Sequence, residues 1–221
     1  MAQNFRRYAL GRVGTTAQAI TASDSYDTVI SIRLANVTSN MVLASAFVTS
    51  DGSTGENIGS DFAYTVTAAG GAFLLDSQNK PAITIYKGFT YTFDVSNASN
   101  SGHVLAFATA ADAAGSTQYT TGVTSSGTAG QAGATVTLVT TSSTPTTLYY
   151  YCTAHTGMGN SITVGDVHYL VKDAPVPSGS SLELIDGGSK IIQAANDHLF
   201  IQSDTASSID AWVSVVDDIS T

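Results

Sequence analysis

The sequence contains little charge, a single cysteine and no long apolar run. Charged residues make up only 11 % of its 221 positions, and the paired Glu and Lys pattern of long surface helices is missing. One cysteine excludes an intrachain disulfide, so the fold must be stabilised by burial or by assembly. No segment approaches the roughly 20 apolar residues that a membrane helix needs. No apolar stretch follows Arg6 and Arg7, so we expect neither a membrane anchor nor a signal peptide.

Basic residues are also scarce. The formal net charge is −9 and the isoelectric point is about 4.5. This balance argues against nucleic acid as a partner, because the phosphate backbone attracts basic surfaces. The one basic cluster consists of Arg6, Arg7 and Arg12. We expect these arginines to contact an acidic neighbour or to remain solvated.

The sequence is instead rich in Gly, Ser, Thr, Ala and Val, and aromatic residues make up 9 % of it. This composition predicts an all-β protein built from many short strands. We expect residues 1–61 and 166–221 to form a β-sandwich outer domain together, because the N-terminal strands alone cannot enclose a core. Residues 62–165 then form a domain inserted into a loop of the outer one. Within the insert, Lys87–Gly88 predicts a corner between two strands on opposite sides of one core.

Local patterns also predict which strands pair. The apolar alternation at 28–36 and the apolar run at 41–49 predict a hairpin across the Asn-bounded turn between them. A second hairpin is expected between 182–185 and 189–193, across an Asp-Gly-Gly turn. Residues 111–133 are rich in Gly, Ser, Thr and Ala. They are expected to form a long surface excursion that caps a site or faces a partner.

A possible metal site follows the aromatic run that ends at Tyr151. Cys152, His155 and Met158 lie within seven residues, and thiolate, imidazole and thioether are ligands that copper prefers. A blue-copper centre needs two histidines, one cysteine and a weak axial methionine. His103 is the candidate for the second histidine, because it lies in a turn between two predicted strands, distant in sequence from the cysteine.

Other interpretations compete with this one. A lone cysteine in a β protein is often a small buried hydrophobe. His168 and His198 are expected to be surface or satisfied core residues. Residues 149–151, all tyrosine, are expected to fill a sandwich core with alternate rings, although a sugar-stacking platform is the alternative.

The remaining acidic and polar motifs predict no catalysis. Asp51, Glu56 and Asp61 lack the fixed spacing of a calcium loop. Asp217 and Asp218 are expected to be a solvated chain end. No Ser, His and acid set lies in a recognisable nucleophile motif. We therefore do not expect an enzyme.

The ligand motif carries a family resemblance. Residues 62–164 resemble a cupredoxin domain, and the Cys-x2-His-x2-Met spacing is similar to the short ligand loop of amicyanin-type members. The resemblance implies a Greek-key β-sandwich with a mononuclear, type 1-like copper ion held by His103, Cys152, His155 and Met158. Val104 departs from the family pattern, since cupredoxins often place an asparagine after the first histidine to brace the thiolate.

The flanking segments carry a second resemblance. Residues 169–184 and 203–210 resemble small β-sandwich virion proteins of tailed bacteriophages. Residues 86–94, 101–103 and 149–152 are similar to cupredoxin-like inserts in structural and fibre proteins of marine phages, including cyanophages. The resemblance implies a capsid decoration, neck or tail protein that docks through its outer domain on other virion proteins. It also implies a homo-oligomer located in the virion, assembled in the host cytoplasm, with an outward-facing insert.

Two other functions remain open from the sequence. The first is a soluble blue-copper electron-transfer or copper-storage protein that uses the same four ligands. The second is contact with a host surface through glycan binding by loops of the insert.

Overall fold

The computed structural model describes residues 4–22, 26–49, 62–113, 115, 117–185, 188–195 and 197–217. Within these residues the regular elements are strands and two short 3-10 helices, η1 (Ala98–Asn100) and η2 (Ala111–Ala113), with no α-helix. The prediction of an all-β protein is therefore confirmed. Its physical basis is the high content of β-branched and aromatic residues, which pack well on a pleated surface.

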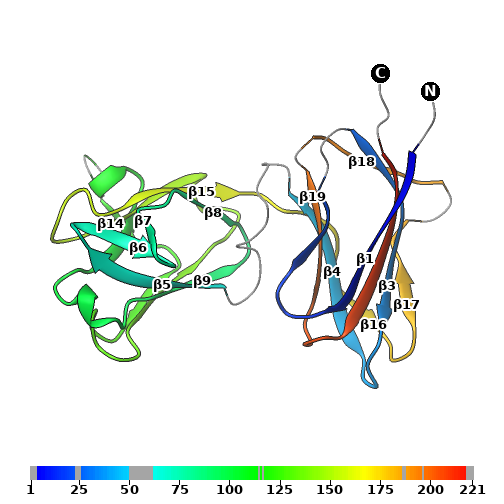
Figure 1. Cartoon of the computed structure of the whole chain (residues 1–221), viewed down its shortest axis with the longest axis horizontal. Helices are drawn as coiled ribbons and strands as arrows, with labels where there is room; N and C mark the ends of the chain where they lie inside the picture. The colour runs from blue at the N-terminus through cyan, green and yellow to red at the C-terminus, as the bar shows by residue number, and fades with distance from the viewer. Residues whose placement is uncertain are drawn as a thin grey trace. The chain divides into compact units, whose positions relative to one another are not determined.

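The chain divides into two compact units. The outer unit comprises Met1–Gly59 and Asp166–Thr221, and the inserted unit comprises Ser60–Gly165. Each unit contains two sheets of its own (Figure 1).

The outer unit contains a five-stranded and a four-stranded sheet. The first consists of β1 (Asn4–Val13), β20 (Ile209–Asp217), β3 (Asp27–Asn36), β17 (Ser181–Glu183) and β18 (Ile191–Gln193). The second consists of β16 (His168–Val176), β4 (Val42–Thr49), β19 (His198–Ser203) and β2 (Gln18–Ala22). One buried cluster draws side chains from both sheets, including Leu34 and Val213 from the first and Ala46 and Ile201 from the second. The two sheets therefore share a single core.

The inserted unit contains a five-stranded and a six-stranded sheet, and both are mixed. The five-stranded sheet consists of β11 (Gln118–Tyr119), β10 (Leu105–Ala108), β14 (Thr147–Cys152), β15 (Asn160–Gly165) and β8 (Ile83–Tyr86). The six-stranded sheet consists of β12 (Val123–Ser126), β13 (Thr135–Val139), β9 (Thr90–Asp94), β5 (Phe62–Ala69), β6 (Ala72–Leu75) and β7 (Gln78–Asn79). The pairs β8–β15 and β5–β9 are parallel, and the others are antiparallel.

Aromatic side chains join the two sheets of the inserted unit. The rings of Phe93 on β9 and Phe107 on β10 lie 5.2 Å apart in an edge-to-face arrangement. The Tyr91 hydroxyl accepts a hydrogen bond of 2.8 Å from the backbone N–H of Tyr86 on the other sheet. The predicted corner at Lys87–Gly88 is confirmed, because it connects β8 and β9 in different sheets and Gly88 has a φ of 90°.

The first predicted hairpin is wrong. β3 pairs with β20, whereas β4 pairs with β16 and β19, so the chain crosses from one sheet to the other between them. The Asn36 side-chain amide donates hydrogen bonds to the carbonyls of Asn40 and Val176, which turns the chain toward β16. A turn of this composition suits either a hairpin or a crossing, so the local sequence does not decide between them.

The second predicted hairpin is also wrong. β17 pairs with residues 33–35 of β3, and β18 pairs with residues 27–29 of the same strand. The ten-residue edge of β3 is long enough to bind both short strands in succession.

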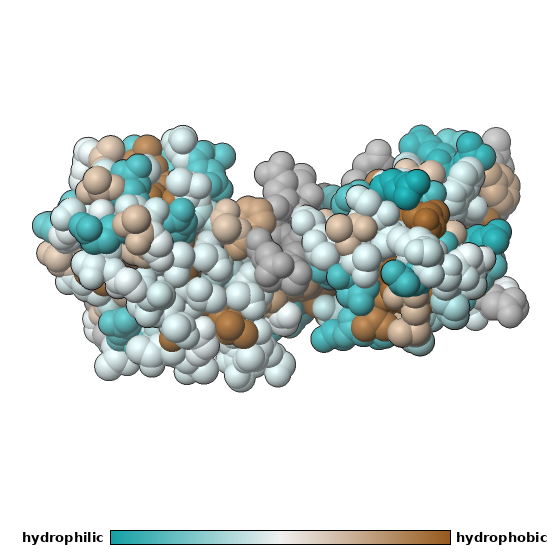
Figure 2. Space-filling view, turned by 90° about the horizontal axis from the view of Figure 1, so that it is seen from below, coloured by the Kyte–Doolittle hydropathy of each residue, from teal (hydrophilic) through white to brown (hydrophobic). Residues whose placement is uncertain are grey.

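The predicted excursion at 111–133 is more ordered than expected. It contains η2, β11 and β12, and the two strands extend the sheets of the inserted unit at β10 and β13. The backbone of this polar segment thus forms hydrogen bonds with β10 and β13 at the edges of the two sheets. On the face that Figure 2 shows, the inserted unit is mostly pale, the colour of residues with intermediate hydropathy, as its Ser, Thr and Gly content leads us to expect.

The predicted solvated chain end is wrong for Asp217. Its side chain is buried and forms an ion pair with Arg6 on the neighbouring strand β1. The expectation that the basic cluster contacts an acidic neighbour is thus correct for Arg6. Asp218 lies outside the described residues, as do Asp51, Glu56 and Asp61.

Candidate metal centre

Three of the four predicted ligands, His103, Cys152 and His155, come together in the inserted unit. The Nδ1 atoms of His103 and His155 lie 3.1 Å apart. The Sγ atom of Cys152 lies 3.9 Å from Nδ1 of His103 and 3.6 Å from Nδ1 of His155. Among the described residues, no other group of three or more His, Cys, Asp or Glu side chains lies close enough to hold an ion.

These separations fit one shared metal ion. Metal–nitrogen bonds of about 2.0–2.1 Å and metal–sulfur bonds of about 2.3 Å place the ligand atoms roughly 3–4 Å apart at bond angles of about 100–130°. All three separations at the cluster lie in that interval. The cluster can therefore hold a metal ion, as in type 1 copper sites.

The pairing of two strands brings His103 to Cys152. Cys152 ends β14 and is the register partner of Leu105, which begins β10. The backbone N–H of Thr153 donates to the Val104 carbonyl at 3.0 Å, which extends this pairing to the residue after His103. The Val104 side chain itself is 50 % exposed. The two ligand segments are thus joined here through the backbone of Val104.

The turn that carries His103 is fixed to β5. The Asn100 side-chain amide is buried and donates to the Val66 carbonyl at 2.8 Å. The Asn100 carbonyl accepts from the N–H of His103 at 2.8 Å. The Ser99 hydroxyl accepts from the Ala68 N–H at 3.0 Å. These bonds order the turn before any metal binds.

The loop that carries His155 and Met158 is held at Gly157 from two sides. The Gly157 N–H donates to the Asp112 carboxylate at 2.9 Å, and the Gly157 carbonyl accepts from the Lys80 ammonium at 3.1 Å. The Met158 carbonyl accepts from the Phe73 N–H at 2.8 Å. Sequence reasoning did not identify Asp112 or Lys80, because they lie 45 and 77 positions from Gly157 and belong to no recognisable motif.

Burial differs between the candidate ligands. Cys152 is 3 % exposed and Met158 is 1 % exposed, whereas His103 is half-buried and His155 is exposed. The sulfur atoms are therefore shielded from water, which protects a thiolate from oxidation. The imidazole of His155 faces solvent and leaves the cluster accessible from one side.

Comparison with known proteins identifies no relative. No family model matches the chain, and it is similar to no curated protein and to no solved structure. What the protein does must therefore be inferred from its own residues and their geometry.

The other candidate residues are not members of this cluster. His168 is exposed on β16, and His198 is buried on β19, so both belong to the outer unit. Tyr150 and Tyr151 are buried, and the Tyr150 hydroxyl donates to the Pro81 carbonyl at 2.8 Å. Tyr149 is half-buried. The burial of the other two rings does not fit a sugar-stacking platform made of all three tyrosines.

No helix in the described part of the chain has the length and hydropathy to span a bilayer.

Proposed function

We propose that the protein binds one copper ion, which His103, Cys152 and His155 would hold, with the Met158 thioether as a fourth, weak ligand. The observation that carries this proposal is the convergence of two imidazoles and one thiol, whose ligand atoms all lie within 4.8 Å of one another. Two histidines and a cysteine with a distant thioether form the ligand set of a blue-copper site. Copper, when bound, supplies one-electron redox chemistry. The chain fixes the ligand positions and excludes water from the sulfur atoms.

The fold proposed for the inserted unit is a cupredoxin-like Greek-key β-sandwich. Its two mixed sheets support this assignment, as does the position of the ligands. One ligand precedes β10, and the others lie at the end of β14 and in the loop that follows it. The Cys-x2-His-x2-Met motif of the sequence resemblance falls on that loop.

Copper binding is tested on the purified full chain by titration with Cu(II). We expect binding of one ion and an intense blue colour from thiolate-to-copper charge transfer, lost in Cys152→Ser and in His103→Ala. His168→Ala is the matched control, because this histidine is exposed in the outer unit, and it should keep the colour. A wild-type protein that stays colourless at saturating Cu(II) would exclude the type 1 site.

We further propose that the protein is a structural component of a bacteriophage particle, a capsid decoration, neck or tail protein. The resemblance of the flanking segments supports this role, and so does the arrangement of the insert. Phe62 pairs with Tyr91 and Gly165 pairs with Tyr86, and Tyr86 and Tyr91 are hydrogen-bonded to each other. Both ends of the inserted unit therefore lie close together, as insertion into a loop requires.

The metal cluster lies at the other end of the inserted unit. β15 begins at Asn160, directly after the ligand loop, and ends at Gly165, where the chain leaves the unit. This arrangement suits a module that presents its site away from the point of attachment. Docking on other virion proteins and assembly as a homo-oligomer belong to the same proposal.

The virion role is tested by mass spectrometry of purified phage particles, in which the chain should be present in repeated copies. Its absence from intact particles would contradict the structural role and leave copper binding untouched. A soluble electron-transfer protein is the second candidate, and the solvent-exposed His155 imidazole favours it as a contact point for a redox partner. That function predicts rapid electron exchange between oxidised and reduced copper protein and no association with particles.

A further inference from the structure

The solvent face of the five-stranded sheet in the outer unit carries two exposed aromatic residues, Phe5 and Trp212. Trp212 lies among small and charged residues, whereas Phe5 is the register partner of Val216 nearer the end of β20. Strand register places Ala9, Trp212, Arg33 and Glu183 in a single row across β1, β20, β3 and β17. Asp210 and Ser214 lie two positions before and after Trp212 on β20, and their side chains therefore point to the same face as the indole. This face belongs to the outer unit and takes no part in the metal cluster.

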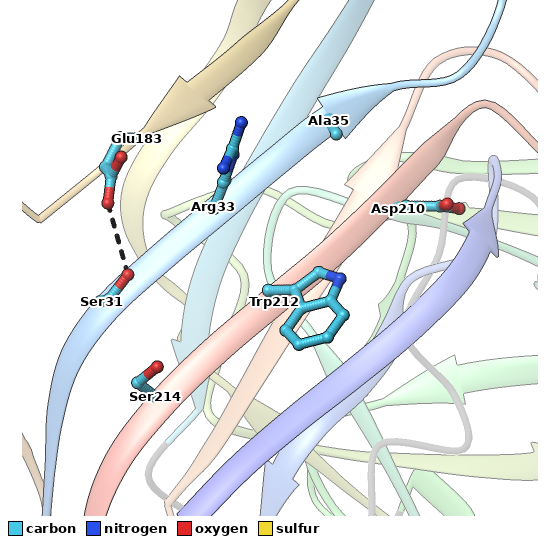
Figure 3. Close-up of a pocket in the computed structure, with 7 residues that line it drawn as sticks. All are labelled: Ser31, Arg33, Ala35, Glu183, Asp210, Trp212 and Ser214. Atoms are coloured by element: carbon cyan, nitrogen blue, oxygen red, sulfur yellow. Dashed lines mark hydrogen bonds between the residues drawn. The ribbon is translucent and has the colours of Figure 1, made fainter.

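A hollow of about 530 Å³ opens on this face. Its lining consists of Ser31, Arg33, Ala35, Glu183, Asp210, Trp212 and Ser214. Figure 3 shows Trp212 on β20, with Arg33 beside it on β3 and Glu183 beyond on β17. Because Ser31, Ala35 and Ser214 have short side chains, the larger residues rise around a shallow floor. The volume lies within the range of about 300–1,000 Å³ that small-molecule sites occupy.

The indole of Trp212 is both exposed and held in place. It is 46 % exposed, although an aromatic ring of this size normally gains free energy by burial. The guanidinium of Arg7 lies over the ring at 4.5 Å from its centroid. This cation–π contact restrains the ring, so a ligand that packs on the remaining indole surface loses little side-chain entropy.

The polar groups around the hollow keep unused hydrogen-bonding capacity. Arg33 donates from Nε to the Ser181 hydroxyl at 3.2 Å, and no protein acceptor within the described chain is found for its Nη groups. Glu183 Oε1 accepts from the Ser31 hydroxyl at 3.4 Å, and Asp210 Oδ1 accepts from a backbone N–H at 2.8 Å. The second carboxylate oxygen of each acid has no protein donor among the described residues. The hollow therefore offers both donors and acceptors to a ligand.

We propose that this hollow binds a neutral oligosaccharide. The C–H face of a pyranose ring packs on the Trp212 indole. Adjacent sugar hydroxyls accept from Arg33 and donate to the carboxylates of Glu183 and Asp210, as charge-assisted hydrogen bonds. A sugar hydroxyl both donates and accepts, so one ligand satisfies all three side chains.

Other ligand classes match the hollow less well. The lining carries charges of both signs, so an anionic ligand meets repulsion from Glu183 and Asp210 and a cationic one meets repulsion from Arg33. A protein interface of this size needs an apolar centre, and Trp212 is the one large apolar side chain in the lining. An apolar small molecule would leave the three charged side chains desolvated without partners.

The test uses the full chain and an array of immobilised neutral oligosaccharides, namely glucans, galactans, mannans and N-acetylhexosamine oligomers. The bound oligosaccharide is then titrated in free form while tryptophan fluorescence is followed. Trp212 is the one tryptophan in the sequence, so a change in its emission reports on this hollow. We expect saturable binding and a shift in emission.

Variants decide whether the hollow is responsible. The variants are compared by calorimetric titration, because the Trp212 variants lack the fluorescent reporter. Trp212→Ala and Arg33→Ala should each weaken binding at least tenfold, while Trp212→Phe should retain part of it. Ile192→Ala, a change at an exposed position of β18 outside the hollow, should bind like the wild type, and thermal unfolding checks that each variant is folded. The proposal is overturned if no neutral oligosaccharide binds, or if binding survives both Arg33→Ala and Glu183→Gln. A fluorescence shift that follows protein concentration instead of saccharide would also overturn it, because the face would then bind a second copy.

Discussion

The Nδ1 atoms of His103 and His155 lie 3.1 Å apart, although 52 positions separate the two residues in the sequence. Two imidazole nitrogens this close, with the Cys152 sulfur within 3.9 Å of both, can hold one metal ion between them. The hydrogen bonds that fix the two ligand segments involve backbone groups and side chains outside the cluster. The site is therefore largely formed before an ion binds.

Copper should stabilise the folded protein by an amount that rises with the logarithm of its free concentration divided by its dissociation constant. An ion that binds the folded state alone stabilises it by about 2.7 kcal/mol when its free concentration is 100 times the dissociation constant. Thermal unfolding of the wild type should therefore shift upward on addition of Cu(II) and return when a chelator removes the ion. Cys152→Ser should show no such shift. An equal shift in both proteins would mean that copper binds elsewhere.

Asp112 and Lys80 should position the ligand loop without contacting the ion. Because the Asp112 carboxylate accepts from the Gly157 N–H at 2.9 Å, Asp112→Ala frees one side of the loop. Loss of such a supporting contact typically lowers metal affinity by about 10–100-fold. We expect a decrease of this size in a competition titration, together with a changed visible spectrum.

Asp94→Ala is the matched control for Asp112→Ala. Asp94 also accepts a hydrogen bond from a backbone N–H, that of Ser96 at 2.9 Å, but it belongs to β9 and not to the ligand loop. Its copper affinity and spectrum should equal those of the wild type. If Asp112→Ala behaves in the same way, the carboxylate does not position the loop.

Gly159 should tolerate no side chain. A Cβ atom at this position would lie 1.7 Å from the Tyr150 carbonyl oxygen, and the strand β14 cannot move away without losing its pairing. Gly159→Ala should therefore destabilise the protein by more than about 3 kcal/mol in urea unfolding. Gly71→Ala is the comparison, since a Cβ there meets no atom within 4 Å and only the positive φ of 75° opposes it. Its cost should be about 1–2 kcal/mol.

Loss of the hydroxyl should change the free energy of unfolding differently at two buried tyrosines, Tyr64 and Tyr91. The Tyr64 hydroxyl is buried and has no hydrogen-bond partner among the described residues, whereas the Tyr91 hydroxyl accepts from Tyr86 at 2.8 Å. Tyr64→Phe removes an unsatisfied polar atom and should leave the free energy of unfolding unchanged or raise it by about 1 kcal/mol. Tyr91→Phe should lower it by about 1–2 kcal/mol. A loss of stability in Tyr64→Phe would show that its hydroxyl has an unseen partner such as water.

Alkaline pH should destabilise the protein, because the buried phenols of Tyr64 and Tyr150 ionise less readily in the folded state than in the unfolded chain. Burial raises the pKa of Tyr64, with smaller contributions from Tyr91, Asp76 and Tyr150, and burial also raises the pKa of Tyr150. In the unfolded chain a tyrosine ionises near pH 10. The resulting stabilisation is therefore fully present below about pH 10 and is lost as the pH rises above it. The urea midpoint should fall above that pH, and it should fall less steeply in Tyr64→Phe.

The sequence was sufficient for the chemistry of the site, because ligand identity is a property of residue type. Cys152, His155 and Met158 lie close together in the chain, and their spacing alone places three soft or borderline ligands on one loop. His103 was identified because it precedes a strand, and three of the four residues indeed come together. The all-β class followed from composition, and the corner at Lys87–Gly88 followed from a glycine between two apolar runs.

Which strands pair was decided only by the tertiary structure. The segments 28–36 and 41–49 are both suited to β-structure, but their partners are chosen by the packing of two sheets on one core and by the Asn36 amide, which bonds Val176 from 140 positions away. The tertiary structure also brings Asp112 and Lys80 to the ligand loop. It likewise places Trp212 in one row with Arg33 and Glu183. Residue type determines what a side chain can bond, whereas only the folded chain determines which distant groups come within reach of it.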